Sequence, residues 1–169
     1  ITVRRGDMVS CDTSGEVQLS DNAADRARSA GTTRTARGAP LPDANAGAQP
    51  ITDPTVLDAF NGREGVNRIV NRTVDLALAD EELGPIFRPF DMVRLRRTLN
   101  EQFCYLLGGG CSYTGRDMRT AHADMGVDTR YFNRLVMHLR TAMREEGVPF
   151  AMQNRFLARL APMHDDIVE

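Results

Sequence analysis

The chain has 169 residues, of which 41 % are hydrophobic and 6 % aromatic, and it contains no tryptophan. This length suits one domain with an extension, and the composition predicts a core of aliphatic and methionine side chains. The net charge of −2 gives no electrostatic reason to expect a nucleic-acid partner. No apolar run is long enough to suggest a transmembrane segment. No signal peptide is visible at the N-terminus, and earlier removal of a leader stays open.

Residues 1–52 differ from the rest because they are polar and contain few large apolar side chains. Within this extension, residues 31–50 are typical of a linker or a disordered segment. Residues 20–30 favour a short helix that lacks an apolar face and would need a partner for stability. We therefore expect residues 1–52 to bind a protein partner, with Cys11 as a surface thiol or a tether.

From Asp53 onward the pattern is helical, and residues 53–169 are predicted to form one domain. Asp53 and Pro54 are typical of an N-cap and a first helical position. The next helix carries an apolar stripe at helical spacing and is broken by Gly84 and Pro85. The stripe consists of Val66, Ile69, Val70, Thr73, Val74, Ala77 and Leu78.

The second half of this domain shows the same helical periodicity. Residues 86–90 form a tight connection, Asp91 caps a third helix, and the glycines at 108–110 end it. Residues 118–123 predict one or two helical turns. A long helix begins after Asp128 or Thr129, and a last helix follows residues 147–149. No segment alternates with period two, so the predicted fold class is all-α.

The most informative polar residue is His122, on the short helical segment between two longer amphipathic helices. A lone histidine in such surroundings is more often a capping or core residue than a metal ligand. Nucleophile elbows, phosphate loops and Cys-x-x-Cys pairs are absent from the sequence. The residues alone leave both interpretations of His122 open.

The domain resembles the group I truncated hemoglobins over residues 57–169. The marks are residues 61–65, 78–80, 86–87, 90–92, 107–109, 113–123, 125–127, 132, 138–139 and 160–169, in the family's order and spacing. The resemblance implies a shortened globin, in which two helix pairs stack as a two-over-two sandwich. It also implies that His122 is the proximal histidine of a heme b.

The resemblance further implies which residues surround the heme. Phe87 matches the phenylalanine that stacks on the porphyrin, and Arg94 and Arg116 are candidate partners of the propionates, although both could simply be solvated. The apolar pocket positions are Val74, Phe87, Leu95, Leu99, Phe103, Met118, Val127, Phe132 and Leu135.

The sequence departs from the family on the distal side of the heme. Val74 stands where many members carry a tyrosine, and Leu99 where many carry a glutamine. Only Thr98 and Gln102 are polar candidates nearby. An apolar distal side predicts weak discrimination in favour of dioxygen over carbon monoxide, because dioxygen depends more on a hydrogen-bond donor.

Cys104 and Cys111 flank the glycine run, and their spacing alone allows either a disulfide or two reduced thiols. A subset of the family with an apolar distal side shares this cysteine pair and carries export signals. That resemblance favours a Cys104–Cys111 disulfide and a periplasmic or otherwise exported protein, with a cytoplasmic location as the alternative.

The sequence thus predicts a globin that binds a diatomic gas (O2, NO or CO) at heme iron. An enzymatic variant, such as nitric-oxide dioxygenation or peroxidase chemistry, is not favoured without the distal tyrosine and glutamine. The alternative is a globin-fold accessory subunit of a larger, possibly membrane-associated assembly, held by residues 1–52, with or without heme. His138 is predicted to be a packed or hydrogen-bonded core residue, and His164 a solvated or salt-linked one.

Overall fold

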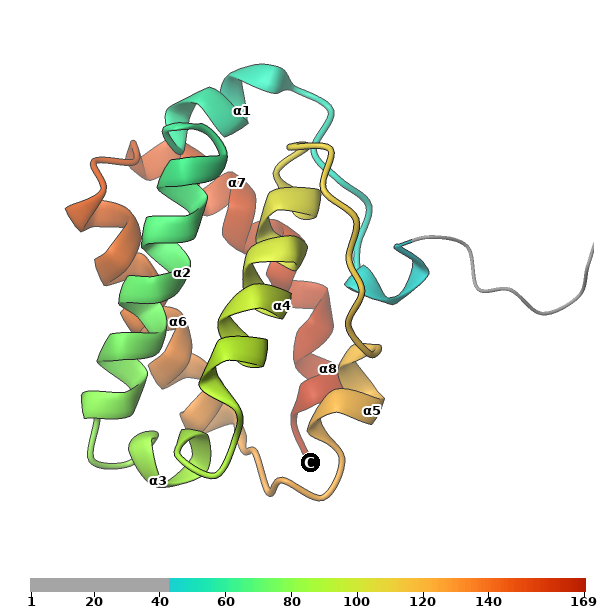
Figure 1. Cartoon of the computed structure of the whole chain (residues 1–169), viewed down its shortest axis with the longest axis vertical. Helices are drawn as coiled ribbons and strands as arrows, with labels where there is room; N and C mark the ends of the chain where they lie inside the picture. Colours follow the sequence, from blue (N-terminus) through green and yellow to red (C-terminus); the bar gives the residue numbers. More distant parts are fainter. Residues whose placement is uncertain (1–42) are drawn as a thin grey trace, which may run out of the picture. The chain divides into compact units, whose positions relative to one another are not determined.

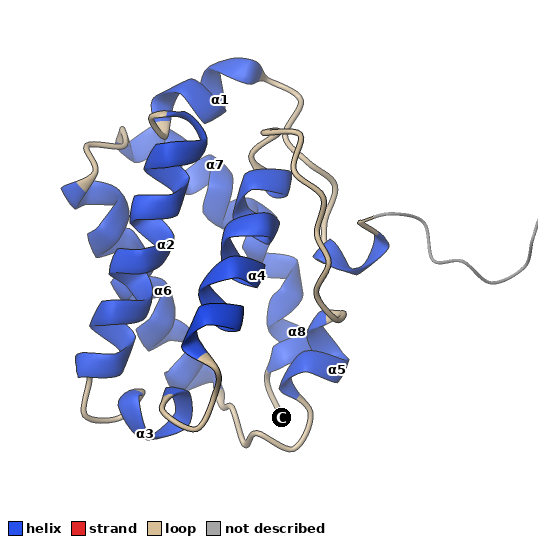
Figure 2. Cartoon of the chain, in the orientation of Figure 1, coloured by secondary structure: helices blue, strands red, loops and turns tan. Residues whose placement is uncertain are grey.

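The computed structural model describes residues 43–169, and this part of the chain is helical without any strand (Figures 1 and 2). The all-α class predicted from the sequence is confirmed. The α-helices are α1 (Pro54–Ala59), α2 (Gly62–Ala79), α3 (Gly84–Phe87), α4 (Met92–Leu106), α5 (Met118–His122), α6 (Thr129–Glu145), α7 (Phe150–Leu160) and α8 (His164–Ile167), with short 3₁₀ turns η1 (Ala44–Ala46) and η2 (Ala161–Met163). None of the helices described here is long and apolar enough to cross a membrane.

Aspartate side chains begin four of these helices, because an aspartate at the N-cap accepts hydrogen bonds from otherwise unpaired N–H groups of the first turn. Asp53, Asp91 and Asp128 cap α1, α4 and α6, as the sequence predicts. Asp117 caps α5 by accepting from Thr120 N. The predicted tight connection at 86–90 instead begins with the helical turn α3, since Pro85 suits the first turn of a helix.

The helices stack as two pairs. In Figure 1, α2 and α4 lie in front of α6 and α7, and α2 packs against both α4 and α6. Phe156 of α7 lies edge-to-face with Phe60 at 5.5 Å between ring centroids and with Phe103 at 4.9 Å. These rings pack together in the core between the layers, and most of the other buried core residues are aliphatic or methionine side chains.

Residues 43–51, which the sequence assigns to the extension and largely to a linker, contact the helical domain. Ala46 is fully buried and Ile51 nearly so. Ile51 N donates to Leu106 O at 2.8 Å. The apolar side chains of Ala46 and Ile51 and a few hydrogen bonds to the backbone hold this segment. Because the rest of the segment is polar, its composition did not predict this packing. The predicted helix at 20–30 and Cys11 lie outside the described residues.

Candidate heme pocket

One cavity of about 270 Å³ lies between α2, α3 and α4 on one side and α5 and α6 on the other. Its wall is almost entirely apolar. The structure brings together all nine apolar residues predicted for the pocket: Val74, Phe87, Leu95, Leu99, Phe103, Met118, Val127, Phe132 and Leu135. Phe90 also lines the cavity and is 46 % exposed, so the cavity opens to the surface beside α3.

His122 lines this cavity from the last position of α5. Its Nδ1 lies 2.8 Å from the backbone oxygen of Met118, one helical turn earlier. A carbonyl oxygen only accepts hydrogen bonds, so Nδ1 of a neutral ring carries the proton and Nε2 keeps its lone pair. Among the described residues, Nε2 has no hydrogen-bond partner. This tautomer is the one that binds a metal ion through Nε2.

The C-terminal residues hold the short helix that carries His122. The Glu169 carboxylate accepts hydrogen bonds from Asp124 N at 2.6 Å and Gly126 N at 3.0 Å, immediately after α5. Arg119 of α5 forms an ion pair with Asp166 of α8 at 2.6 Å. A five-residue helix has little stability of its own, so its orientation depends on these contacts.

Three of the hydroxyl groups in the cavity wall, those of Thr73, Thr98 and Tyr113, lie within hydrogen-bond distance of backbone oxygens. The hydroxyl of Thr73 donates to Ile69 O at 2.7 Å, and that of Thr98 lies 3.0 Å from both Arg94 O and Leu95 O. Tyr113 donates its hydroxyl hydrogen to Arg116 O at 2.8 Å. The face formed by Val74, Leu95 and Leu99 is therefore as apolar as the sequence predicts.

Arg94 and Arg116 do not line the cavity, and both side chains are exposed. Their suggested contact with heme propionates stays a prediction. The sequence reasoning did not name several lining residues, because a helical stripe shows which residues face inward but not which of them border a cavity. They are Val70, Leu83, Ile86, Phe90, Tyr113, Ala121, Met125, Tyr131, Val136, Leu139, Leu160, Met163 and Ile167.

The other two histidines have partners, as predicted. His138 Nε2 lies 2.8 Å from the Asp80 carboxylate, and its side chain is largely buried. His164 lies 3.0 Å from Asp165 through Nδ1 and packs edge-on against Phe132. Neither histidine lines the cavity.

Two helix pairs around an apolar cavity, with one imidazole facing into it, are the architecture of a globin of the two-over-two type. The comparison with protein families agrees with this class. The chain belongs to the bacterial-like globins, whose family model matches residues 55–169.

The related proteins are group 1 truncated hemoglobins, which confirms the resemblance noted in the sequence. GlbN of Mycolicibacterium paratuberculosis is 31 % identical over 113 residues, which cover 67 % of this chain and 83 % of that protein. LI410 of Chlamydomonas moewusii is 34 % identical over 91 residues, 53 % of each chain.

Solved structures show the same fold. The truncated hemoglobin of Tetrahymena pyriformis in its Fe(III) form superposes with a TM-score of 0.64 and is 24 % identical, covering 67 % of this chain and 97 % of that one. Chlamydomonas reinhardtii THB1 gives a TM-score of 0.59 at 26 % identity, covering 68 % and 96 %.

Globins of this family bind heme, and the cavity fits that group. A porphyrin is a large apolar ligand, so an apolar cavity favours its burial. An open mouth leaves room for the charged propionates in water. His122 supplies one nitrogen ligand of the right tautomer.

Proposed function

We propose that this chain holds one heme b through Nε2 of His122 and binds a diatomic gas at its iron. The observation that carries the proposal is the 2.8 Å contact between His122 Nδ1 and Met118 O, which directs the Nε2 lone pair away from the backbone on a ring that lines the cavity. When bound, the heme supplies an iron atom with one position left for the gas.

The protein contributes orientation and exclusion of water. Met118 O fixes the ring of His122, and Phe87, Leu95 and Leu99 present an apolar surface. A gas beside this surface receives no hydrogen bond from Thr73, Thr98 or Tyr113, whose hydroxyl hydrogens are committed. Among O2, NO and CO, bound dioxygen depends most on such a hydrogen bond. We therefore infer that the site discriminates only weakly in favour of dioxygen. We assign no enzymatic activity.

The decisive experiment is an absorption spectrum of the purified full chain in ferric, ferrous and carbonmonoxy forms. We expect a Soret band in the wild type and its loss or a marked shift in His122→Gly. Added imidazole should restore the wild-type spectrum by filling the space left by the side chain. His164→Gln is the control, because His164 contacts Phe132 but does not line the cavity.

Two results would contradict the proposal: a wild-type chain that shows no Soret band after incubation with hemin and removal of the unbound hemin, or a His122→Gly variant with an unchanged ferrous spectrum. Far-ultraviolet circular dichroism of the variant separates loss of the ligand from loss of the fold.

We also propose that the protein is exported. The Cys104–Cys111 disulfide supports this, because such bonds persist in oxidising compartments. Localisation by cell fractionation tests it. The accessory-subunit alternative depends on the extension, whose residues 1–42 lie outside the described part, and it stays a prediction from the sequence.

A further inference from the structure

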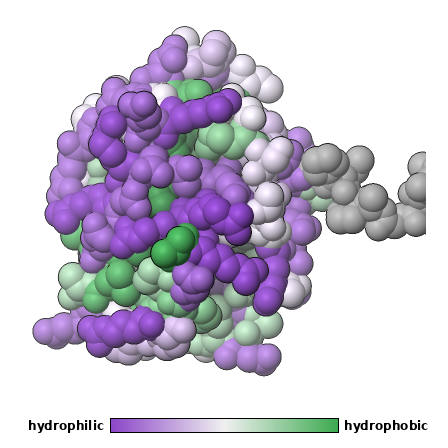
Figure 3. All heavy atoms as spheres, in the orientation of Figure 1, coloured by the Kyte–Doolittle hydropathy of each residue, from purple (hydrophilic) through white to green (hydrophobic). Residues whose placement is uncertain are grey.

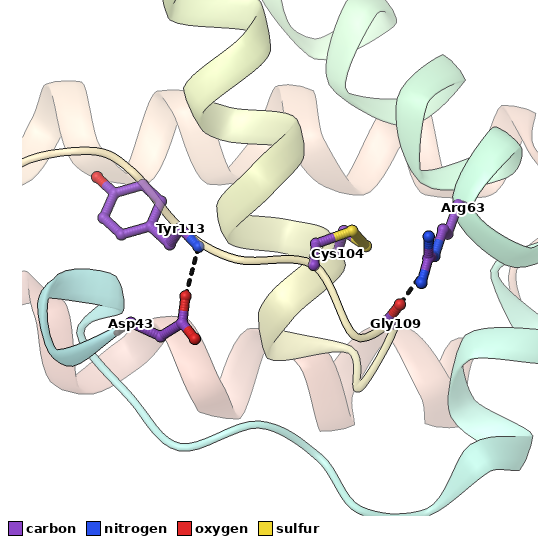
Figure 4. Close-up of a disulfide and its surroundings, with 6 residues drawn as sticks. Asp43, Arg63, Cys104, Gly109 and Tyr113 are labelled. Carbon is purple, nitrogen blue, oxygen red and sulfur yellow. Dashed lines mark hydrogen bonds between the residues drawn. A yellow bond between two sulfur atoms is a disulfide. The ribbon is translucent and has the colours of Figure 1, made fainter. Parts of the chain in front are cut away.

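Residues 43–51, called here the 43–51 strap, precede the part of the chain that matches the family model. Hydrogen bonds join the strap to the loop that leads from α4 to α5. Asp43 Oδ1 accepts from Tyr113 N at 2.5 Å, as Figure 4 shows, and Asn45 Nδ2 donates to Gly115 O at 3.3 Å. Ala46, which directly follows Asn45, is fully buried. This segment does not line the cavity itself, but it lies directly behind Gln102 and Tyr113, which do.

The strap contacts one polar side chain of the cavity, Gln102. This residue follows Leu95 and Leu99 on the same face of α4, at positions i, i+4 and i+7, and all three line the cavity. Gln102 is only 4 % exposed. Its Nε2 donates to Ala46 O at 3.0 Å and lies 3.4 Å from Met118 Sδ.

The amide of Gln102 has two N–H donors. Ala46 O of the strap accepts one hydrogen, and only two thioether sulfurs, which are weak acceptors, lie near the other: Met118 Sδ at 3.4 Å and Met163 Sδ at 3.8 Å from Nε2. A buried amide deprived of Ala46 O needs a new acceptor, because an unsatisfied buried donor is costly. A gas ligand in the same cavity offers one.

We propose that the 43–51 strap sets the polarity of the gas site: by accepting the amide hydrogen of Gln102, Ala46 O withholds a donor that lies on the same helix face as Leu95 and Leu99. Gln102 is then a specificity-determining residue whose effect the strap suppresses. This inference rests on the proposed function for its effect on gas binding, but the contact between strap and amide exists without heme.

The test displaces the strap by one substitution with a matched control. Gly47 has φ +87°, and a Cβ added there would lie 2.7 Å from Met163 Cε and 3.0 Å from its Cγ and Sδ. Gly147 has φ +82°, but a Cβ there meets nothing within 4 Å. Gly47→Leu therefore combines backbone strain in the strap with a clash against Met163, whose side chain lines the cavity, whereas Gly147→Leu carries the strain alone.

The first readout is oxygen dissociation from the ferrous heme protein, with the C–O stretching frequency of the carbonmonoxy form. We expect Gly47→Leu to slow oxygen dissociation about tenfold, as one hydrogen bond to a polar ligand would, and to lower the C–O stretch. Adding Gln102→Leu to Gly47→Leu should abolish the effect, because the double variant has no amide to donate. Gly147→Leu should behave as wild type.

The second readout needs no heme: hydrogen exchange of the Gln102 side-chain amide, followed by NMR and assigned by its loss in Gln102→Leu. We expect slow exchange in the wild type and Gly147→Leu, and fast exchange in Gly47→Leu. Fast exchange in the wild type, or slow oxygen dissociation that persists in the Gly47→Leu/Gln102→Leu double variant, would overturn the inference. A missing Soret band together with slow exchange would refute the proposed function and leave the strap contact standing.

Discussion

Asp80 is the carboxylate on which the connection between α2 and α3 depends. Its side chain is 5 % exposed, and it accepts from Arg134 Nε at 2.7 Å and pairs with His138 Nε2 at 2.8 Å. It also accepts from Leu83 N, the residue before α3. Burial raises the pKa of this carboxyl, but the hydrogen bonds from Arg134 and His138 outweigh it and hold the pKa well below its usual range. Asp80 therefore helps to position the helix that carries Phe87.

Replacing Asp80 by asparagine tests this arrangement. We expect Asp80→Asn to lower the free energy of unfolding by about 2–3 kcal/mol, because Arg134 and His138 lose the negative charge of the carboxylate that both contact. The matched control is Asp165→Asn, since Asp165 also pairs with a histidine but its side chain is 94 % exposed. Asp165→Asn should change the free energy of unfolding by no more than about 0.5 kcal/mol. Equal effects in urea denaturation would contradict the role given to Asp80.

The segment between α4 and α5 is held by a disulfide and by backbone contacts (Figure 4). Cys104 and Cys111 are bonded, with 5.7 Å between their Cα atoms, so the pairing favoured by the resemblance is present. Gly109 lies against the bridge: an added Cβ would be 2.6 Å from Cys104 Sγ. Arg63 Nε donates to Gly109 O at 2.8 Å. These contacts set where the loop toward His122 begins.

Opening the bridge should destabilise the domain without removing the cavity. We expect Cys111→Ser to lower the free energy of unfolding by about 2 kcal/mol, the value for a short closed loop, while Cys104 keeps its buried sulfur. Thermal unfolding with and without a reductant measures the loss. The reductant should lower the melting temperature of the wild type and leave Cys111→Ser unchanged; an equal effect on both would contradict this account.

The whole molecule carries an apolar cavity between its layers. Figure 3 shows apolar residues among hydrophilic ones on the face viewed in Figure 1, and Phe90 at the mouth is 46 % exposed. Side chains around an apolar cavity lack packing partners on one side. A ligand that fills the cavity therefore stabilises the folded state.

Heme removal should accordingly lower the stability of the whole domain. Saturation at one hundred times the dissociation constant contributes about 2.7 kcal/mol, which corresponds to a melting temperature higher by about 10 °C for a domain of this size. Differential scanning calorimetry of the heme-free protein, with and without hemin, checks it. In His122→Gly the increase should be much smaller, and an equal increase would argue against ligation by His122.

Much of the fold follows from local sequence. Aspartate caps at Asp53, Asp91 and Asp128, glycine stops and apolar stripes at helical spacing are properties of a few neighbouring residues. They placed the main helices correctly. The candidate site followed from motif resemblance, which put His122 and the nine apolar residues in one pocket, and the structure brings them together.

Other features depend on contacts between distant segments, which periodicity does not encode. The C-terminal residues reach the loop after α5 through Glu169, and residues 43–51 pack on the domain although their composition resembles a linker. The sequence by itself determined the main helices and the fold class, and only the family resemblance singled out His122 among the three histidines. Only the tertiary structure decided that the amide of Gln102 already has an acceptor, because Ala46 O lies on a distant backbone segment that folding brings beside α4.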